Sequence, residues 1–333
     1  MSKVFIIAEA GVNHNGDVRV AKEMIEIAAE AKVDAIKFQT WKTELMVTKF
    51  AKQAEYQILN TSIVESQFDM LKKLELTYDE FVELKIYCDK LNIQFMSTPD
   101  ELESAAFLSK YQEVFKIGSG NVTNLPLLRF IGGLQKQIIL STGMSTLEEI
   151  KSAINVLEKS GTQRSHITLL HCTTQYPAPM NELNLSAISH MRHIFNLPVG
   201  YSDHSSGIEA SIAAVALGAT VIEKHFTLDC NLPGPDHKAS LDPLGLKNLV
   251  ISIRNIEDAL GSGEKKVTDS ESANIPIARK SIVTTKPIKK GEIFTIDNIG
   301  VKRPGIGVSP MEWDSVIGRK SARNYAEDEL IEI

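Results

Sequence analysis

Short apolar runs that end in polar residues recur eight times before about residue 262, and each precedes a stretch with helical periodicity. The runs are KVFIIAEAG, DAIKFQT, IQFMSTP, VFKIGSG, QIILSTG, HITLLHCTT, PVGYSDHS and TVIEKHFTL. Continuous apolar strands that alternate with helices are typical of a parallel sheet covered on both faces, and eight in a row favour a closed (β/α)8 TIM barrel. No G-x-G-x-x-G motif follows the first run, which argues against a dinucleotide-binding fold.

The helical stretches are predicted between these strands from the spacing of their apolar residues. They cover 18–31, 64–74, 79–91, 102–110, 125–134, 146–161, 185–195, 208–217 and 244–260. The segment from Trp41 to about residue 62 has no such pattern, and it is long for a connection in this architecture. We expect it to form a loop that can cover the mouth of the barrel.

The pattern changes after residue 262, where polar residues give way to short strands punctuated by Gly and Pro. We therefore predict a barrel domain over 1–262, a linker over 263–280 and a small β-rich domain over 281–333, with one short helix in PMEWDSVIG. A domain of about 50 residues buries too little surface to be very stable alone. Packing on this barrel, or on the barrel of a partner chain, would supply the missing contacts.

The composition is ordinary for a soluble protein, with 43% hydrophobic and 23% charged residues and a formal net charge of −6. A mildly acidic chain with scattered lysine pairs argues against nucleic-acid binding. Three widely spaced cysteines fit a reducing compartment. The apolar run near the N-terminus is too short for a signal peptide, and no segment has the length of a membrane span. These features predict a cytoplasmic protein.

Polar side chains end every predicted strand, which is where TIM barrels carry their active sites. Lys37 and Lys116, together with the hydroxyls of Ser119, Ser141 and Ser202, would suit a phosphate or a small phosphorylated acid. A single Ser or Thr at such a position can equally cap a turn or a helix. Two lysines inside apolar strands are harder to explain in that way, because they have no easy solvated alternative.

His204 and His225 end the seventh and eighth predicted strands. Adjacent strands lie about 5 Å apart, so both imidazoles could reach one ion. A buried histidine is also a common core residue, but two at matching positions favour a metal. With only two His ligands, the site would suit Mn²⁺, Co²⁺ or Mg²⁺ better than a structural Zn²⁺. Glu223 should share a face with His225, while Lys224 between them should point away.

The ordered motifs resemble those of one enzyme family along essentially the whole chain. They include IAEAGVNHNGD, IKFQT, FMSTP, KIGSG, ILSTGM, LLHCTTQYPAP, GYSDHSSG and IEKHFTLDCNLPGPDHKAS, and the tail KRPGIGVSPMEW. They are similar to the phosphoenolpyruvate-condensing nonulosonic acid synthases, the sialic and legionaminic acid synthase family. The resemblance implies a TIM barrel, a C-terminal antifreeze-like (SAF) domain, and a homodimer whose exchanged C-terminal domains reach over the partner's active site.

The resemblance also implies the reaction. Phosphoenolpyruvate condenses with water and an open-chain N-acylated mannosamine, either N-acetylmannosamine or 2,4-diacetamido-2,4,6-trideoxymannose. The products are N-acetylneuraminate or N,N'-diacetyllegionaminate and phosphate, formed by metal-assisted aldol-like attack and C–O cleavage. The segments AEAGVNHNG, LPVGYSDH and GSGEKK slightly favour the legionaminate branch. The alternatives are a related barrel that uses a different, phosphorylated sugar, and an inactive sugar-binding relative.

Site residues follow from the same resemblance. A divalent metal, usually Mn²⁺, falls on His204 and His225. Glu9 and Glu223 match active-site carboxylates, and Glu9 is assigned as the acid/base near C2 of phosphoenolpyruvate. The phosphoenolpyruvate site comprises Lys37, Thr98, Lys116, Ser119, Ser141 and Ser202. The sugar site comprises Gln39, Tyr176, Asp236 and, from the partner chain, Arg303.

Two positions depart from the family pattern. Asn121 follows KIGSG where relatives commonly carry Glu or Asp, and an amide cannot act as a base. Thr174 stands where relatives often have Asn. The first departure puts a proton-transfer role at that position in doubt, while the second should alter a polar contact only.

Overall fold

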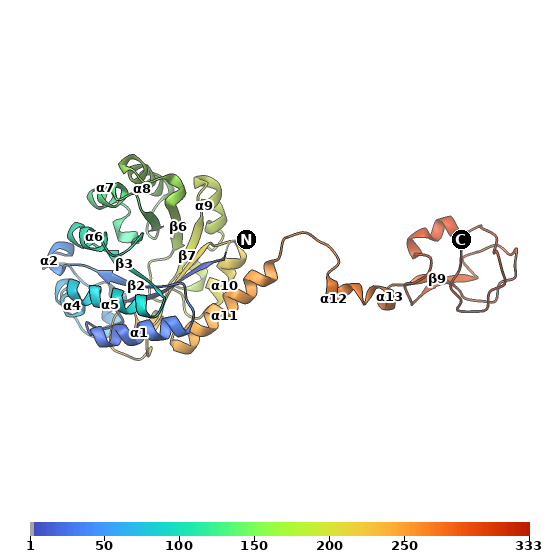
Figure 1. Ribbon diagram of the computed structural model, residues 1–333, viewed down its shortest axis with the longest axis horizontal. Coiled ribbons are helices and arrows are strands. Elements are labelled where there is room, and N and C mark those ends of the chain that lie inside the picture. Colours follow the sequence, from blue (N-terminus) through green and yellow to red (C-terminus); the bar gives the residue numbers. More distant parts are fainter. Residues whose placement is uncertain (1–2) are drawn as a thin grey trace. The chain divides into compact units, whose positions relative to one another are not determined.

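The computed structural model describes residues 3–333, which form two compact units, residues 3–262 and residues 263–333. Figure 1 shows the strands and helices of each unit along the chain. Residues 1 and 2, at the start of the predicted barrel domain, lie outside the described residues. Within the part that is described, no helix is both long and apolar enough to cross a bilayer.

Eight parallel strands form the sheet of the first unit, in the order β3-β2-β1-β8-β7-β6-β5-β4. Their bounds are β1 (Phe5–Gly11), β2 (Ala35–Thr40), β3 (Gln94–Pro99), β4 (Val114–Ile117), β5 (Gln137–Ser141), β6 (Ile167–Cys172), β7 (Val199–Asp203) and β8 (Val221–His225). Over residues 3–333 no ladder joins β3 to β4, but their Cα atoms approach within 8 Å. The predicted barrel is confirmed, with one seam that is not hydrogen-bonded.

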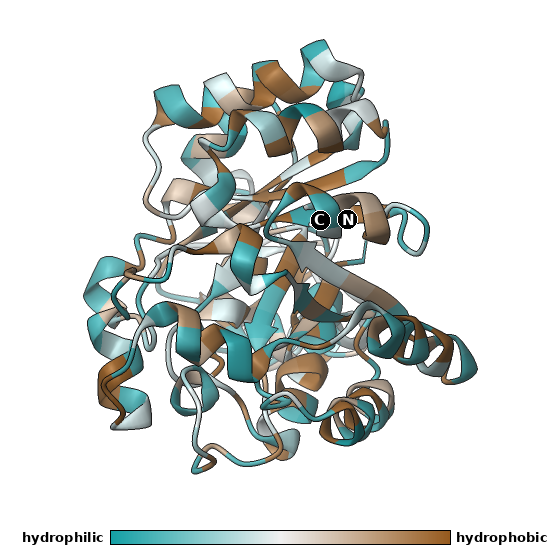
Figure 2. Cartoon of the chain, turned by 90° about the vertical axis from the view of Figure 1, so that its left-hand side faces the viewer, coloured by the Kyte–Doolittle hydropathy of each residue, from teal (hydrophilic) through white to brown (hydrophobic). Residues whose placement is uncertain are grey.

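Helices cover the outside of the barrel, and their stripes of hydrophobic residues are visible in Figure 2. They are α1 (Val18–Glu30), α4 (Gln67–Leu74), α5 (Tyr78–Lys90), α6 (Leu102–Leu108), α7 (Leu125–Gly133), α8 (Leu147–Ser160), α9 (Ala187–Phe195), α10 (Glu209–Ala216) and α11 (Pro243–Leu260). Local chemistry sets the ends of α8: Thr146 and Glu149 form a capping box, and Gly161 follows with a φ of 126°.

The long connection after β2 is less irregular than expected. It contains two short helices, α2 (Thr43–Met46) and α3 (Glu55–Thr61). Both are shorter than the span over which hydrophobic periodicity can be recognised, which is why the sequence pattern missed them.

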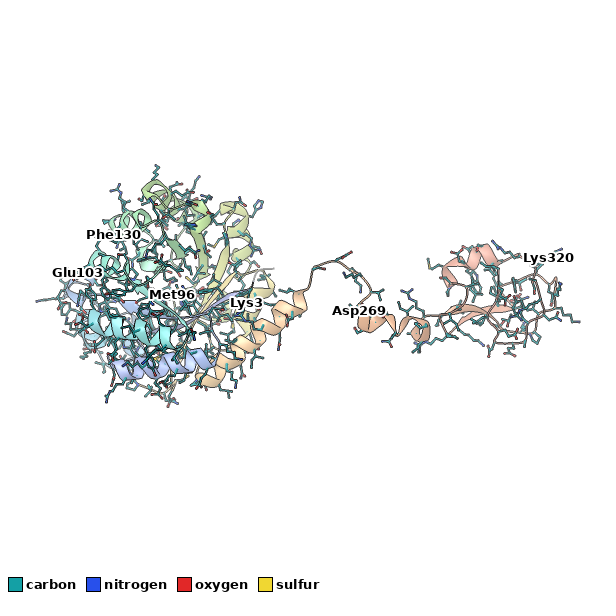
Figure 3. All side chains as sticks on the ribbon, viewed as in Figure 1. Lys3, Met96, Glu103, Phe130, Asp269 and Lys320 are labelled. Atoms are coloured by element: carbon teal, nitrogen blue, oxygen red, sulfur yellow. The ribbon has the colours of Figure 1, made fainter. Side chains whose placement is uncertain are left out.

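Apolar side chains from six strands fill the inside of the barrel below its mouth: Ile7, Ala35, Met96, Ile139, Leu170 and Val221. Figure 3 places Met96 at the centre of the unit. This layer, called the apolar plug below, closes the barrel from below, so that a ligand enters at the carboxyl ends of the strands.

The second unit has its own small core. Strands β9 (Ser281–Thr284) and β10 (Ile299–Lys302) pair in an antiparallel sheet. Its buried residues are Ile282, Ile288, Phe294, Ile299, Val316, Tyr325 and Ile331. The segment predicted as a linker contains the short helices α12 (Asp269–Ser272) and α13 (Ile275–Ala278). The predicted helix within PMEWDSVIG is present as a 3-10 turn followed by α14 (Trp313–Val316).

Candidate active site

One layer of polar side chains lies directly above the apolar plug. Glu9 follows Ile7 of the plug by two residues, and Lys37 and Glu223 follow other plug residues at the same spacing, so all three point inward. The ladder register places Glu9 beside Lys37 on β2 and beside His225 on β8. The side chains that the sequence placed at strand ends are thus brought together by adjacent strands.

Two lysines and two glutamates form a buried ionic cluster in this layer. Lys37 Nζ lies 2.7 Å from Glu9 Oε2 and 3.6 Å from Glu223 Oε2. Lys116 Nζ lies 3.3 Å from Glu223 Oε1. All four side chains are at most 5% exposed. The charges balance when all four side chains are ionised. Buried charged groups need such compensation because they have lost their hydration.

The two glutamates differ in their affinity for a proton. Burial raises the pKa of Glu9 to about 7, against the opposing effect of Lys37 and with help from the negative charge of Glu223. Burial would also raise the pKa of Glu223, but Lys116 and Lys37 outweigh it and lower that pKa to about 2. The cluster therefore holds one proton-exchanging carboxyl and one permanent carboxylate near neutral pH.

Hydroxyl groups fix the charged side chains in place. Thr98 Oγ1 accepts a hydrogen bond from Lys37 Nζ at 3.0 Å. Ser202 Oγ donates to Glu223 Oε1 at 2.8 Å. Both hydroxyls are among the predicted ligands of the phosphorylated substrate, and both lie on the ionic cluster.

A second group of hydroxyls surrounds the turn after β5. Ser119 Oγ accepts from the backbone N–H of Gly143 at 3.0 Å, and Ser141 Oγ is buried without a partner in the described chain. A Cβ at Gly143 would lie 2.3 Å from Thr174 Oγ1 and 2.9 Å from Ser119 Oγ. Only glycine leaves this space open, and an anion could use the donors that line it.

His204 and His225 lie side by side, as the sequence predicted. Their ring centroids are 5.5 Å apart, and the Tyr176 ring lies 4.2 Å from that of His204 and 5.5 Å from that of His225. His204 Nδ1 lies 2.7 Å from the carbonyl oxygen of Thr173. This contact favours a proton on Nδ1 and leaves a lone pair on Nε2, the arrangement found in metal-binding histidines.

The histidine pair fits a cation. Burial lowers the pKa of His204 to about 4 and that of His225 well below its usual value, so both rings are neutral and can act as ligands. His225 Nδ1 is buried with no hydrogen-bond partner among residues 3–333, and Asp236 Oδ2 is 4.0 Å away. Groups of three or more His, Cys, Asp or Glu suited to a metal are absent from the described residues. An ion held here would keep positions open for water or substrate oxygens.

The other predicted sugar residues border the histidines. Gln39 Nε2 donates to Glu9 Oε1 at 3.2 Å. Asp236 is buried, which raises its pKa to about 6. Tyr56 also lies beside these sugar residues, since its ring is 5.1 Å from that of Tyr176. Sequence reasoning missed Tyr56 because it lies on α3, in the segment expected to be a loop.

Arg303 lies in the second unit, where its Nε donates to the carbonyl oxygen of Ala278. Residue 303 is exposed, and the structure does not relate it to the barrel. Its predicted role at a partner's site therefore stays a prediction.

Lys224 has a partner that the sequence did not reveal. It lies on the face of β8 opposite to Glu223, where it is fully buried and 3.0 Å from Asp203 Oδ2. Asp203 also accepts hydrogen bonds from the side chains of Ser205 and Ser211, both at 2.6 Å. This second buried ion pair joins the ends of β7 and β8 on the face of the sheet opposite to Glu223. Its Asp203 directly precedes His204 in the sequence.

Known proteins resemble this chain in sequence and in fold. The chain is 54% identical to N,N'-diacetyllegionaminic acid synthase of Campylobacter jejuni, over 99% of both chains. It is 44% identical to the enzyme of the same name from Legionella pneumophila, over 97% of this chain and 91% of the relative. The crystal structure of a sialic acid synthetase from Leptospira borgpetersenii, in complex with citrate, superposes with a TM-score of 0.73 at 37% identity. That match covers 82% of this chain and 90% of the other.

Two family models divide the chain in the same way. The NeuB family model matches residues 24–265, and the SAF domain model matches residues 279–332. The first match spans most of the barrel and the second spans the small β domain. This chain therefore belongs to the NeuB family and carries a C-terminal SAF domain.

Proposed function

We propose that this protein condenses phosphoenolpyruvate with an open-chain N-acylated mannosamine and water, giving a nonulosonic acid and inorganic phosphate. The observation that carries the proposal is the buried cluster of Glu9, Lys37, Lys116 and Glu223, set beside neutral His204 and His225. Two lysines that could bind a phosphorylated acid thus lie close to two histidines that could hold a cation for the carbonyl substrate. The relatives named as synthases support the same reaction class.

Lys37 and Lys116 would bind the phosphate and carboxylate of phosphoenolpyruvate. The ligand is strongly anionic, and the lysines are the only cations of the ionic cluster. Thr98, Ser119, Ser141 and Ser202 add hydroxyl donors around them, and the free hydroxyl of Ser141 supports that assignment. Preorganised donors of this kind stabilise the phosphate as it takes up negative charge on C–O cleavage.

His204 and His225 would hold a divalent cation, Mn²⁺ in our proposal, with Mg²⁺ or Co²⁺ as the other choices. When bound, such a cation polarises the aldehyde of the sugar as a Lewis acid. Gln39, Tyr176 and Asp236 would orient the sugar so that its aldehyde carbon meets C3 of phosphoenolpyruvate. Their position around the histidines supports this role.

The resemblance implies that Glu9 is the acid/base near C2 of phosphoenolpyruvate, and in our proposal it acts instead as the proton donor to the aldehyde oxygen of the sugar. A carboxyl with a pKa of about 7 is partly protonated at neutral pH and can release its proton to the oxygen of the aldehyde. Glu223 is a poor candidate for the same task because it stays ionised, and its role would be to hold Lys37 and Lys116 in position. The condensation also needs a group that accepts a proton from the water added at C2.

We further propose a homodimer in which the SAF domain of one chain completes the site of the other, with Arg303 as its sugar contact. Exposed apolar residues on both units support an association. Phe50 on the long connection after β2 is 86% exposed, while Ile306 and Met311 near Arg303 are 66% and 91% exposed. A partner surface that covers such residues would remove them from water.

The proposed reaction is tested by phosphate release from phosphoenolpyruvate with each sugar in turn. We expect 2,4-diacetamido-2,4,6-trideoxymannose to be the better substrate, because the relative with 54% identity is named for the legionaminate product. N-acetylmannosamine should react more slowly, and a phosphorylated hexosamine should not react. Absence of sugar-dependent phosphate release with every N-acylmannosamine would contradict the proposed function.

Loss of the cation should abolish turnover. We expect chelation to lower kcat by at least about 100-fold, with recovery on adding Mn²⁺, because a Lewis acid stabilises the transition state by several kcal/mol. Mn²⁺ should also raise the Tm of the wild-type protein, and this shift should vanish in His204→Ala and His225→Ala. The matched control is His190→Ala on α9, which should keep both responses. Full activity of a chelated protein would refute the metal site.

A further inference from the structure

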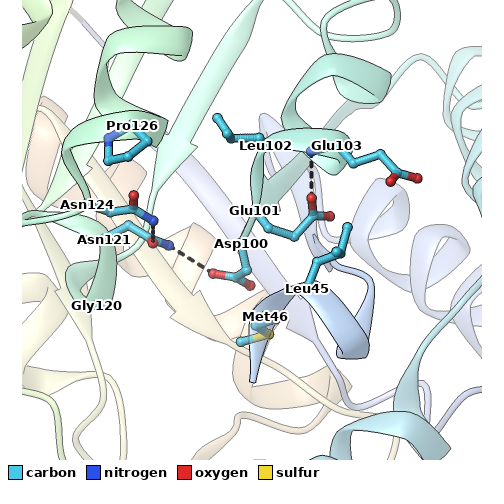
Figure 4. A pocket seen from close by; sticks show the side chains of 10 residues that line it. All are labelled: Leu45, Met46, Asp100, Glu101, Leu102, Glu103, Gly120, Asn121, Asn124 and Pro126. Carbon is cyan, nitrogen blue, oxygen red and sulfur yellow. Dashed lines mark hydrogen bonds between the residues drawn. The ribbon is translucent and has the colours of Figure 1, made fainter. Parts of the chain in front are cut away.

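A cavity of about 630 Å³ is lined by residues that follow β3 and β4, and one of them, Asp100, is influenced by the charges of Lys37 and Lys116 in the ionic cluster. Figure 4 shows its lining, in which the exposed apolar side chains of Leu45 and Met46 face a polar wall. The polar wall contains Asp100, the first residue after β3, and Asn121, from the turn after β4. None of these residues has a part in the reaction described so far.

Asp100 is held in a defined orientation. Its Oδ1 accepts a hydrogen bond from Asn121 Nδ2 at 3.1 Å, and Asn121 Oδ1 accepts from Asn124 Nδ2 at 3.0 Å. Both bonds are drawn in Figure 4. The amide of Asn121 cannot change its protonation state, so it can orient the carboxylate of Asp100 without competing for its proton.

The charges around Asp100 come from three elements. Lys37 on β2 and Lys116 on β4 stabilise the ionised form of Asp100, while Glu101, its neighbour, opposes it. Burial outweighs the lysines and raises the pKa of Asp100 to about 6. The carboxyl is therefore ionised at neutral pH and close enough to its pKa to take up a proton.

The other two acidic residues of the cavity are occupied or directed elsewhere. Glu101 caps α6, accepting hydrogen bonds from the backbone N–H groups of Glu103 and Ser104. Glu103 interacts with Tyr78 and is labelled at the left-hand edge of the first unit in Figure 3. Among the described acidic residues that line this cavity, only Asp100 is hydrogen-bonded to Asn121. The positive charges of Lys37 and Lys116 favour its ionised form.

We propose that the Asp100 carboxylate, oriented by Asn121, accepts the proton of the water that adds to C2 of phosphoenolpyruvate. The inference rests on the proposed function. In the step, the water oxygen bonds to C2 and one of its protons moves to Asp100, while Glu9 supplies a proton to the former aldehyde oxygen. The C2–O bond to phosphate then breaks, and the second proton of the added water leaves with the phosphate. Asp100 loses its proton, and Glu9 regains one, by exchange with solvent.

The assignment explains how the site works without a carboxylate at position 121. The neighbouring strand end supplies the base, and the amide supplies its orientation. The cavity provides space for the attacking water and a path along which the proton can reach solvent.

The test is the pH dependence of kcat for Asp100→Asn at saturating substrates. Asn at this position keeps an oxygen that can accept from Asn121 Nδ2, so the fold should be preserved, as thermal unfolding will verify. We expect kcat at pH 7.5 to fall by about 100-fold. The wild-type rate should decline as pH drops through about 6, because protonated Asp100 cannot accept a proton. That decline should disappear in Asp100→Asn and return in Asp100→Glu.

The matched control is Glu103→Gln, which removes one negative charge from the same cavity. It should leave kcat unchanged, and it should also leave unchanged the decline of kcat at acidic pH, called the acidic limb here. Wild-type phosphate release is measured first, so that failure of the proposed reaction is separate from failure of this inference. With an active wild type, the inference is overturned if Asp100→Asn retains kcat within threefold, or if it loses activity but keeps the wild-type acidic limb.

Discussion

Lys37→Met is expected to lower kcat/KM for phosphoenolpyruvate by roughly 10²- to 10³-fold, the range seen when a preorganised electrostatic donor is removed. The lysine contacts Glu9 and Glu223 and is 3% exposed. Its removal takes away one of the two cations of the cluster and leaves both carboxylates facing Lys116. The substituted site would attract an anionic substrate poorly and would tend to neutralise Glu9 by protonation.

The loss in Lys37→Met should be a loss of function in a folded protein. The control is Lys85→Met, since Lys85 forms a surface ion pair with Asp89 four residues along α5. Neither residue lies on a barrel strand or belongs to the ionic cluster. That variant should keep wild-type kcat/KM because an exposed pair contributes little. A Lys37→Met protein that unfolds at the wild-type temperature yet retains kcat/KM within fivefold would contradict the role given to the cluster.

Lys224→Met is expected to lower the free energy of unfolding by about 3–5 kcal/mol, the usual cost of leaving one partner of a buried ion pair alone. Asp203 would keep its hydrogen bonds from Ser205 and Ser211, but it would lose Lys224, its one ion-pair partner among residues 3–333. Urea-induced unfolding at pH 7.5 measures the change. Lys85→Met serves again as the control, with little expected change.

The double variant Lys224→Met/Asp203→Asn separates the cost of an unpaired charge from the value of the pair. It should be more stable than Lys224→Met, because no buried charge is left without a counter-charge. Equal stability of the single and double variants would mean that the ion pair is not what joins the ends of β7 and β8.

The regular part of the fold could be predicted because the apolar runs and helical stretches have clear periods. Lys37 and Lys116 could be recognised because a lysine inside an apolar strand needs a specific partner. The period-two alternation in IEKH also placed Glu223 and His225 on one face. Family resemblance supplied Tyr176, Asp236 and Arg303, which no local pattern marks.

Other features have no local signal. Asp203 follows strand-like residues in GYSDHSS, and nothing in that motif reveals that its counter-charge is Lys224 on the next strand. Tyr56 and the short helices α2 and α3 depend on contacts with distant segments. The environment of Asp100 combines lysines from two other strands with an amide from the next turn, so it exists only after the barrel has closed.

The most direct test of the central claim uses phosphoenolpyruvate carrying ¹⁸O in the oxygen that bridges C2 and phosphorus. We predict that phosphate is released only when an N-acylmannosamine and Mn²⁺ are present, and that the released phosphate carries the ¹⁸O label, because the C2–O bond is the one that breaks. Phosphate that appears without the sugar, or a label that remains on the organic product, would contradict the account.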